Sequence, residues 1–353
     1  MFDPATLAEP IVQAPLAGGP STPELAIAVC EAGGLGFIAA GYKTPDALRE
    51  QIEAAQTRTD RPFGVNIFVP TPEPADPEAL APYLSRLEPE AGRQGAEVGE
   101  PRFEDDHFDA KLKAVCDTRP AVVSFTFGCP ATQVFSELHE HDIAAWVTVT
   151  SGAEAATALA AGADGLVLQG TEAGGHRGAF VDNEDAGGIG LLALLQLVRP
   201  TTSLPLIASG GIAQGAAVAA VLCAGAAAAQ IGTALMLTPE AGTEQAQREI
   251  LNEPIPTRLT RAFSGRLARG MVNRFMLEHS DSAPIAYPEI HHATSPLRAA
   301  ARRNGDAHSF NLWAGQAHEL AQARPAGEIV RELGADARRT IHELAQRLDQ
   351  TGR

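Results

Sequence analysis

The chain has 353 residues, of which 45% are hydrophobic and 20% are charged, an ordinary balance for a globular protein that excludes disorder over the whole length. Aspartate and glutamate number 43 against 27 lysines and arginines, giving a net charge of −16. This charge argues against a general nucleic-acid binder, because an acidic surface repels phosphate backbones. Residues 1–10 carry two acids and no lysine or arginine, so we expect no signal peptide.

Short apolar runs alternate with alanine-rich helical patterns over the first two thirds of the chain. The apolar runs predict eight strands, at 11–14, 36–40, 64–69, 121–127, 144–150, 165–169, 205–209 and 229–235. Helical patterns lie between most of them, at 23–32, 44–55, 131–139, 153–161 and 190–198. Such alternation is typical of βαβ units in a parallel sheet. Eight units predict an α/β protein with a closed (β/α)8 TIM barrel, and an open doubly wound sheet is the alternative.

Two regions depart from this alternation. Residues 70–104 begin with a stretch rich in proline and acids, which predicts an excursion from the barrel and leaves the order of 70–101 open. Beyond about residue 238 no further strand is predicted. We therefore expect residues 1–250 to form the barrel and residues 251–353 to form a mostly helical segment over its mouth. This second segment could include the last helix of the barrel.

Two further patterns bear on location and on metals. The longest apolar stretch, at 213–237, is rich in alanine and glycine and contains two glutamines, which predicts a buried helix and strand rather than a membrane span. The four cysteines are widely spaced and form no C-x-x-C pair, so we expect reduced thiols in a cytoplasmic protein. His291 and His292 are adjacent and lack a matching carboxylate pattern, so we expect them on a lid or surface and predict no metal site.

Glycine turns follow the last two predicted strands. TIM-barrel active sites lie at the C-terminal ends of the strands, and the loops after the seventh and eighth strands commonly bind phosphate. Here these loops contain Ser209-Gly210-Gly211 and Gly232-Thr233. Glycine suits such turns because it has no Cβ to block the approach of an anion to backbone N–H groups and because it adopts positive φ. The two turns together predict a phosphate site.

Three polar side chains at other strand ends are candidates for ligand contact. Asn66 and Gln169 end apolar strands, and an amide offers the donor and the acceptor that the edge of a flavin requires. Core amides satisfied by the backbone are the alternative. His176 follows Glu172-Ala173-Gly174-Gly175, a loop flexible enough to fold over a ligand. A neutral imidazole there could accept a proton or bind an oxygen atom, with a surface histidine as the alternative.

Several enzyme classes lack their motifs in this chain. No G-x-S-x-G elbow is present, which disfavours an α/β-hydrolase. No G-x-G-x-x-G follows the first strand and no P-loop occurs, which disfavours a dinucleotide-binding Rossmann domain and a nucleoside triphosphatase.

At these residues the chain resembles the nitronate monooxygenase family, formerly called 2-nitropropane dioxygenases, which are FMN enzymes on a TIM barrel. The matching pieces run in order over nearly the whole chain, at 13–19, 21–25, 31–36, 64–68, 169–178, 209–212 and 230–233. Two later pieces, at 260–270 and 312–316, resemble the class I branch. The chain departs from the family at Leu16, where methionine is frequent, and at Ser209, where alanine is common.

The resemblance implies a role for each matching position. His176 would be the catalytic histidine, and Ala14, Pro15 and Leu16 would line the isoalloxazine ring of FMN. The remaining implied cofactor contacts are Asn66, Gln169, Gly174, Gly175, Ser209, Gly210, Gly211, Gln230, Ile231, Gly232 and Thr233. Which cation, if any, would meet the carboxylate of a substrate is left open, with Arg177, Arg261, Arg266 and Arg269 as candidates.

The implied activity is the oxidation of alkyl nitronates, such as propionate 3-nitronate, by O2 to a carbonyl compound and nitrite. It would proceed through a flavin semiquinone, serve nitronate detoxification, and need no NAD(P)H, metal, nucleic acid or membrane.

Three other functions stay open at this point. The first is an FMN-dependent enoyl-acyl-carrier-protein reductase that uses NAD(P)H and shares the Glu-Ala-Gly-Gly-His loop. The second is a regulatory barrel without activity that binds flavin or phosphate. The third is a barrel like IMP dehydrogenase, for which Cys129 is the only candidate nucleophile. The oligomeric state is also open, with a homodimer among the alternatives.

Overall fold

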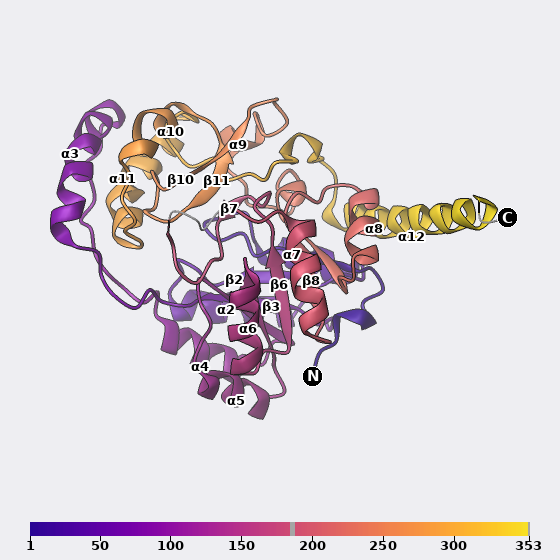
Figure 1. Ribbon diagram of the computed structural model, residues 1–353. Coiled ribbons are helices and arrows are strands. Elements are labelled where there is room, and N and C mark those ends of the chain that lie inside the picture. The colour runs from indigo at the N-terminus through magenta and orange to yellow at the C-terminus, as the bar shows by residue number, and fades with distance from the viewer. Residues whose placement is uncertain (184–187, 352–353) are drawn as a thin grey trace.

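The central feature of the computed structural model, which describes residues 1–183 and 188–351, is a barrel of eight parallel strands (Figure 1). The strands are β1 (Ile11–Gln13), β2 (Phe37–Ala39), β3 (Gly64–Phe68), β4 (Val122–Thr126), β5 (Ala144–Val149), β6 (Gly165–Gln169), β8 (Leu206–Ser209) and β9 (Ala228–Ile231). Their order is β1-β9-β8-β6-β5-β4-β3-β2, and a parallel bridge between Val12 and Leu35 closes the ring. All eight predicted strands and the TIM barrel are confirmed, so the open sheet is excluded.

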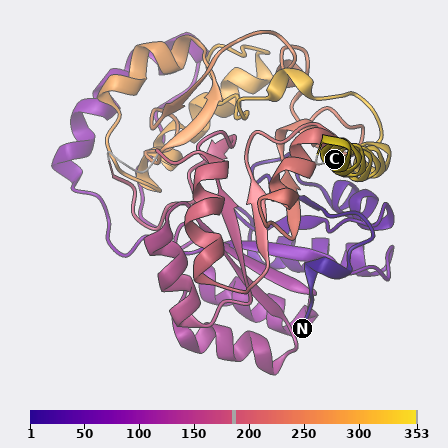
Figure 2. The ribbon, with the colours of Figure 1, turned by 45° about the vertical axis from the view of Figure 1, so that its right-hand side comes forward.

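Helices surround the barrel (Figures 1 and 2), at the predicted positions except for α4, for which the sequence analysis gives no helical pattern. They are α1 (Pro23–Glu31), α2 (Pro45–Gln56), α4 (Phe108–Thr118), α5 (Thr132–Glu140), α6 (Gly152–Ala161), α7 (Leu191–Val198) and α8 (Gly215–Cys223). Their starts follow from local chemistry, because Thr22, Thr44 and Ser151 each accept a hydrogen bond at a helix N-terminus. The barrel strands are buried almost throughout, as expected for a parallel sheet covered on its outer face.

The proline-rich excursion is ordered and helical. Helix α3 (Pro77–Gln94) lies beside α11 (Glu289–Arg303), far from the barrel helices, and both views show this (Figures 1 and 2). Tyr83 is fully buried between α3 and the C-terminal region and donates a hydrogen bond to the carbonyl oxygen of Ala262 at 2.6 Å. The excursion therefore belongs to a cap over the barrel.

The prediction that strands stop after residue 238 is wrong. Strands β10 (Thr257–Thr260) and β11 (Ala268–Met271) pair antiparallel, and β11 also pairs with β7 (Gly175–His176) of the loop after β6. These strands are short and partly basic, so they show no apolar run. β10 and β11 are neighbours in sequence, whereas the pairing of β11 with β7 joins distant parts of the chain. The cap also contains α9 (Gln245–Arg248) and α10 (Arg274–His279).

The last helix, α12 (Ala326–Thr351), packs against α8 and α1 and so occupies the place of the eighth barrel helix, before it projects from the body (Figure 1). Five short 3-10 helices complete the fold, η1 (Pro4–Thr6), η2 (Arg199–Thr201), η3 (Thr233–Leu235), η4 (Ser280–Ser282) and η5 (His318–Leu320). Across residues 1–183 and 188–351, no helix has both the length and the apolar character that a membrane span needs. The four cysteines are unpaired, as predicted.

Candidate active site

A cavity of about 320 Å³ lies at the C-terminal ends of the barrel strands, under the cap. Its size falls within the usual range for a small-molecule site. The structure brings nearly all of the predicted site residues to its wall: Ala14, Pro15, Leu16, Asn66, Gln169, Gly174, Gly175, His176, Ser209, Gly210, Gly211, Gln230, Gly232 and Thr233. Ile231 is the exception, because its side chain is buried in the barrel core and does not line the cavity.

The two glycine turns present free backbone donors to the cavity. Gly210 has φ 122° and Gly211 has φ 68°, both in the region that favours glycine. Within the described chain, the backbone N–H groups of Gly210, Gly211, Gly232 and Thr233 donate no hydrogen bond. Four unpaired donors on two adjacent turns form a suitable site for a phosphate.

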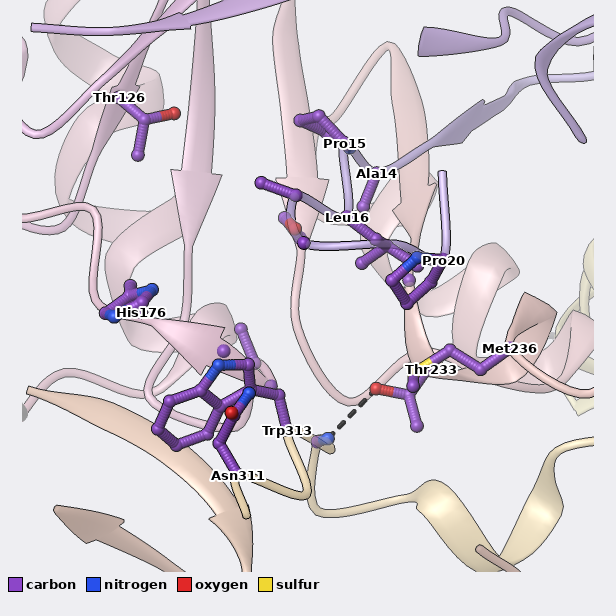
Figure 3. Close-up of a pocket in the computed structure, with 18 of the residues that line it drawn as sticks. Ala14, Pro15, Leu16, Pro20, Thr126, His176, Thr233, Met236, Asn311 and Trp313 are labelled. Atoms are coloured by element: carbon purple, nitrogen blue, oxygen red, sulfur yellow. Dashed lines mark hydrogen bonds between the residues drawn. The ribbon is translucent and has the colours of Figure 1, made fainter. Parts of the chain in front are cut away.

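Opposite walls of the cavity come from different parts of the chain (Figure 3). Ala14, Pro15 and Leu16 lie on one side, and His176 and Trp313 lie across the opening from them. The loop after β1 is held by the hydroxyl of Ser21, which accepts hydrogen bonds from the Leu16 backbone N–H at 2.7 Å and from the Gln13 amide at 2.8 Å. The arrangement leaves an open slot with one apolar wall, which suits a flat ring system.

The two predicted amides are partly used within the protein. The Asn66 amide nitrogen donates to the backbone oxygen and hydroxyl of Ser124 and to the hydroxyl of Thr126, so its oxygen is the atom left for a ligand. Gln169 donates to the backbone oxygen of His176 at 3.0 Å and accepts from the backbone N–H of Gly178 at 2.8 Å. Gln169 therefore fixes the loop that carries His176, in addition to lining the cavity.

Two other polar side chains on the wall lack protein partners. Gln230 is 6% exposed and Ser209 is 8% exposed, and neither side chain forms a hydrogen bond with any residue that the structure describes. Both side chains face the cavity, so their polar atoms are available to bond to a polar ligand there.

The segment 312–316 of the cap closes over the loop that carries His176. The backbone N–H of Gly315 donates to the hydroxyl of Thr233 at 3.0 Å (Figure 3). A Cβ at Gly174 would lie 2.5 Å from the backbone of Ala314 and Gly315, so only glycine permits this approach. The resemblance at 312–316 thus corresponds to a contact that shapes the cavity.

His176 is oriented by Ser264, which the sequence analysis missed. Its Nε2 lies 2.8 Å from the Ser264 hydroxyl, which can donate to the backbone oxygen of Arg266 at 3.1 Å. With the serine proton directed at Arg266, Nε2–H donates to the serine and Nδ1 keeps its lone pair. With the serine proton directed at Nε2, the Nδ1 atom carries the proton. Nδ1 has no partner in the described chain, so this atom is free to meet a ligand in either state.

His176 is a neutral base in this environment. It is packed between the aromatic rings of Phe127, Tyr287 and Trp313, with ring centroids 5.4 to 5.9 Å away. Burial, together with the charges of Arg266 and Arg298, lowers the pKa of His176 to about 3. The imidazole is therefore uncharged at neutral pH and can accept or donate a hydrogen bond without carrying charge into the cavity.

This lowered pKa predicts a specific loss of stability in acid. An unfolded histidine has a pKa of about 6.5, so between pH 6.5 and pH 3 the unfolded chain binds a proton that the folded chain does not. Folded stability must then fall as pH decreases through this window. Between pH 7.5 and pH 5.0, wild-type protein without ligand should lose roughly 2 kcal/mol more unfolding free energy than His176→Gln. Urea unfolding at both pH values measures this; equal losses would contradict a neutral His176.

Tyr42 adds a hydrogen-bond donor to the cavity wall near His176. The Tyr287 hydroxyl donates to the Tyr42 hydroxyl at 3.3 Å, which leaves the Tyr42 proton free for a ligand. Burial raises the pKa of Tyr42 to about 12, so this proton is retained at neutral pH. His291, expected on a lid or surface, lies on α11 of the cap, stacks on the Tyr42 ring at 4.2 Å between centroids and lines the cavity. His292 instead pairs with Glu104.

None of the four arginines named as candidates for a substrate carboxylate lines the cavity. Arg177 donates to the backbone oxygens of Gln169 and Gly170, and Arg269 to that of Thr171. Arg261 pairs with Asp182, and Arg266 bonds to the backbone of Arg177 and Ala179. These contacts hold the β7–β11 region together. The arginines that line the cavity are Arg298 and Arg302.

Two other predictions concern nucleophiles and metals. Cys129 does not line the cavity, and burial raises its thiol pKa, so the alternative of a cysteine nucleophile loses support. Within residues 1–183 and 188–351, one group of side chains has the spacing of a metal site, Glu90, Glu278 and His279. Arg93 and Arg274 form ion pairs with both of these carboxylates, so the group is already neutralised by protein cations.

A closed barrel with free donors at its last two strand ends, and with a histidine held over an apolar slot, defines a TIM-barrel enzyme. The family model described as nitronate monooxygenase matches residues 4–336. The chain belongs to the nitronate monooxygenase family, and its relatives are oxidoreductases.

Similar proteins cover the chain almost completely. A nitronate monooxygenase of Paraburkholderia phytofirmans is 40% identical over 96% of this chain and 94% of its own length. The crystal structure of a nitroalkane oxidase from Streptomyces ansochromogenes is 48% identical, with a TM-score of 0.94 over 97% of this chain and 99% of that one. FabK from Thermotoga maritima is less similar, at 27% identity and a TM-score of 0.75 over 96% of both chains.

Proposed function

We propose that this protein binds FMN in the cavity and oxidises alkyl nitronates with O2 to a carbonyl compound and nitrite. The observation that carries the proposal is the set of polar groups on one wall that have no protein partner, because these donors and acceptors match a phosphate group and the edge of a flavin ring. The free N–H groups of Gly210, Gly211, Gly232 and Thr233 would bind the phosphate. The Gln230 and Asn66 amides would meet the ring edge, and the loop from Ala14 to Leu16 would form its floor.

FMN would supply the redox chemistry, by accepting electrons from the substrate and passing them to oxygen. The protein supplies position and hydrogen bonds. His176 Nδ1 faces the substrate in one of two proton states that the Ser264 hydroxyl permits. With Nδ1 protonated, it donates to a nitronate oxygen; with Nδ1 unprotonated, it removes the α-proton of a neutral nitroalkane. Tyr42 would donate a second hydrogen bond to the nitro group, and the surrounding rings exclude water.

The test is oxygen consumption and nitrite formation by FMN-loaded protein supplied with propionate 3-nitronate, without NAD(P)H. We expect one carbonyl product for each nitrite released. Absence of both products, with FMN bound, would reject the proposed activity.

The enoyl-acyl-carrier-protein reductase has less support, because both family-specific segments, 260–270 and 312–316, build the wall around His176. NADH oxidation with an enoyl thioester would identify it. A regulatory barrel without activity also has less support, because a neutral histidine oriented by Ser264 at the cavity wall is an arrangement suited to chemistry. We further propose a cytoplasmic location, which the four unpaired cysteines support.

A further inference from the structure

Two arginines of the cap reach the cavity wall with a single carboxylate between them. Arg298 and Arg302 lie one turn apart on α11, and both line the cavity. Like charges at this spacing destabilise a helix, and burial adds a desolvation cost. Arg298 has no carboxylate within 4.0 Å in the described chain, whereas Arg302 pairs with Glu244 at 3.9 Å, a largely exposed side chain that also lines the cavity. Two positive charges thus meet one negative charge, and this excess of positive charge favours an anion from outside the chain.

Asn311 connects the two guanidinium groups. Its Oδ1 accepts a hydrogen bond from Arg298 Nη1 at 3.2 Å and from Arg302 Nη2 at 2.9 Å. Asn311 is 9% exposed and lines the cavity, yet its Nδ2 donates to no residue that the structure describes. The amide therefore presents two N–H donors beside two positive charges, on the wall that also holds Trp313 and His176 (Figure 3).

The two arginines differ in how firmly they are held. Arg298 also donates to the Thr294 hydroxyl and to the backbone oxygen of His291, so its direction is fixed. Within the described chain, the Arg302 side chain forms a single hydrogen bond, which goes to Asn311, so most of its N–H groups are free. Arg302 thus supplies the free donors, and Arg298 and Asn311 set their position.

We infer that Arg298, Arg302 and Asn311 form a subsite for a carboxylate carried by the substrate at the end remote from its nitronate group. The inference rests on the proposed function and names the class of nitronate that the site selects. A carboxylate fits because its two oxygens match the parallel N–H groups of a guanidinium. The phosphate of the cofactor already has its donors at Gly210–Gly211 and Gly232–Thr233, on the wall formed by the barrel strands.

The experiment compares two substrates of equal chain length, propionate 3-nitronate and propyl 1-nitronate, on FMN-loaded wild-type protein and Arg302→Met. Loss of charge-assisted hydrogen bonds should lower kcat/KM for propionate 3-nitronate roughly 10- to 100-fold. For propyl 1-nitronate, which has no carboxylate, kcat/KM should change less than about threefold. Arg302→Lys, which keeps the charge, should recover part of the loss, and a folding defect would not be recovered in this selective way.

Arg303→Gln is the matched control, because Arg303 is the next residue on α11, is exposed and does not line the cavity. It should leave both substrates unaffected. Equal losses for both substrates in Arg302→Met, or no loss for either, would overturn the inference. Weakened FMN binding in that variant would also overturn it, because it would assign the arginines to the phosphate.

A binding measurement separates failure of this inference from failure of the proposed function. If the wild-type protein oxidises neither nitronate, the proposed function is rejected. Titration of the FMN-loaded protein with propionate, followed by the flavin absorption spectrum, then tests the subsite alone. Weaker propionate binding by Arg302→Met than by wild type would support the subsite, and equal binding would overturn it.

Discussion

The His176→Ala variant is expected to retain FMN and to lose most of its turnover. The imidazole lines the cavity with its Nδ1 free, while its backbone is fixed by the β7–β11 pairing and by Gln169. Removing the side chain therefore leaves the cofactor wall intact and removes the group that holds or deprotonates the substrate. A positioned acid or base contributes about 10²- to 10⁴-fold, so kcat/KM should fall by that amount. Steady-state kinetics with FMN occupancy measured by absorbance checks this.

His139→Ala is a matched control for His176→Ala. His139 bonds to Asp164 at the outside of the barrel and does not line the cavity. It should keep full activity, with at most a small loss of stability. If His176→Ala keeps full activity with nitronate and with nitroalkane, His176 has no part in the mechanism.

The Gly210→Ala variant is expected to lose FMN affinity. Gly210 has φ 122°, a conformation that an L-residue rarely adopts, and an added Cβ would lie 3.0 Å from the backbone nitrogen of Ala173. Strain of this kind costs about 1–3 kcal/mol and would displace the turn that offers free N–H groups. We expect the Kd for FMN to rise roughly 10- to 100-fold, measured by titration of the apoprotein with FMN fluorescence.

Gly92→Ala controls for the loss of a glycine as such. Gly92 lies in α3 with open space around its Cβ position, so alanine there should be neutral or slightly stabilising. A Gly210→Ala variant that melts at a lower temperature yet binds FMN with unchanged Kd would contradict the assignment of this turn to the phosphate.

The barrel could be predicted because its determinants are local. Each strand is an apolar run such as Ala144–Val149, buried on both faces, and several helices begin at a capping serine or threonine. The strand-end rule then located the glycine turns, Gln230 and His176, because every parallel strand ends at the same face. The resemblance includes Ile231 because it lies between Gln230 and Gly232, but the alternation of side chains along β9 directs the Ile231 side chain into the core.

The cap could not be predicted in the same way, because its contacts join residues far apart in sequence. Ser264 meets His176 across 88 residues, and no local pattern marks that serine as a partner. Arg298, Arg302 and Asn311 belong to the cap, outside any strand end, so the strand-end rule does not indicate them. The i, i+4 pair of arginines on a helix with buried alanines was a signal that could have indicated them.

The most direct test of the central claim is the visible absorption spectrum of the purified protein before and after anaerobic addition of propionate 3-nitronate. We expect the bands of oxidised flavin at first and their loss when the nitronate is added, because the substrate would reduce the bound cofactor. An oxidised flavin spectrum that the nitronate leaves unchanged would contradict the proposed substrate class. A colourless protein that takes up no added FMN would contradict the cofactor assignment itself.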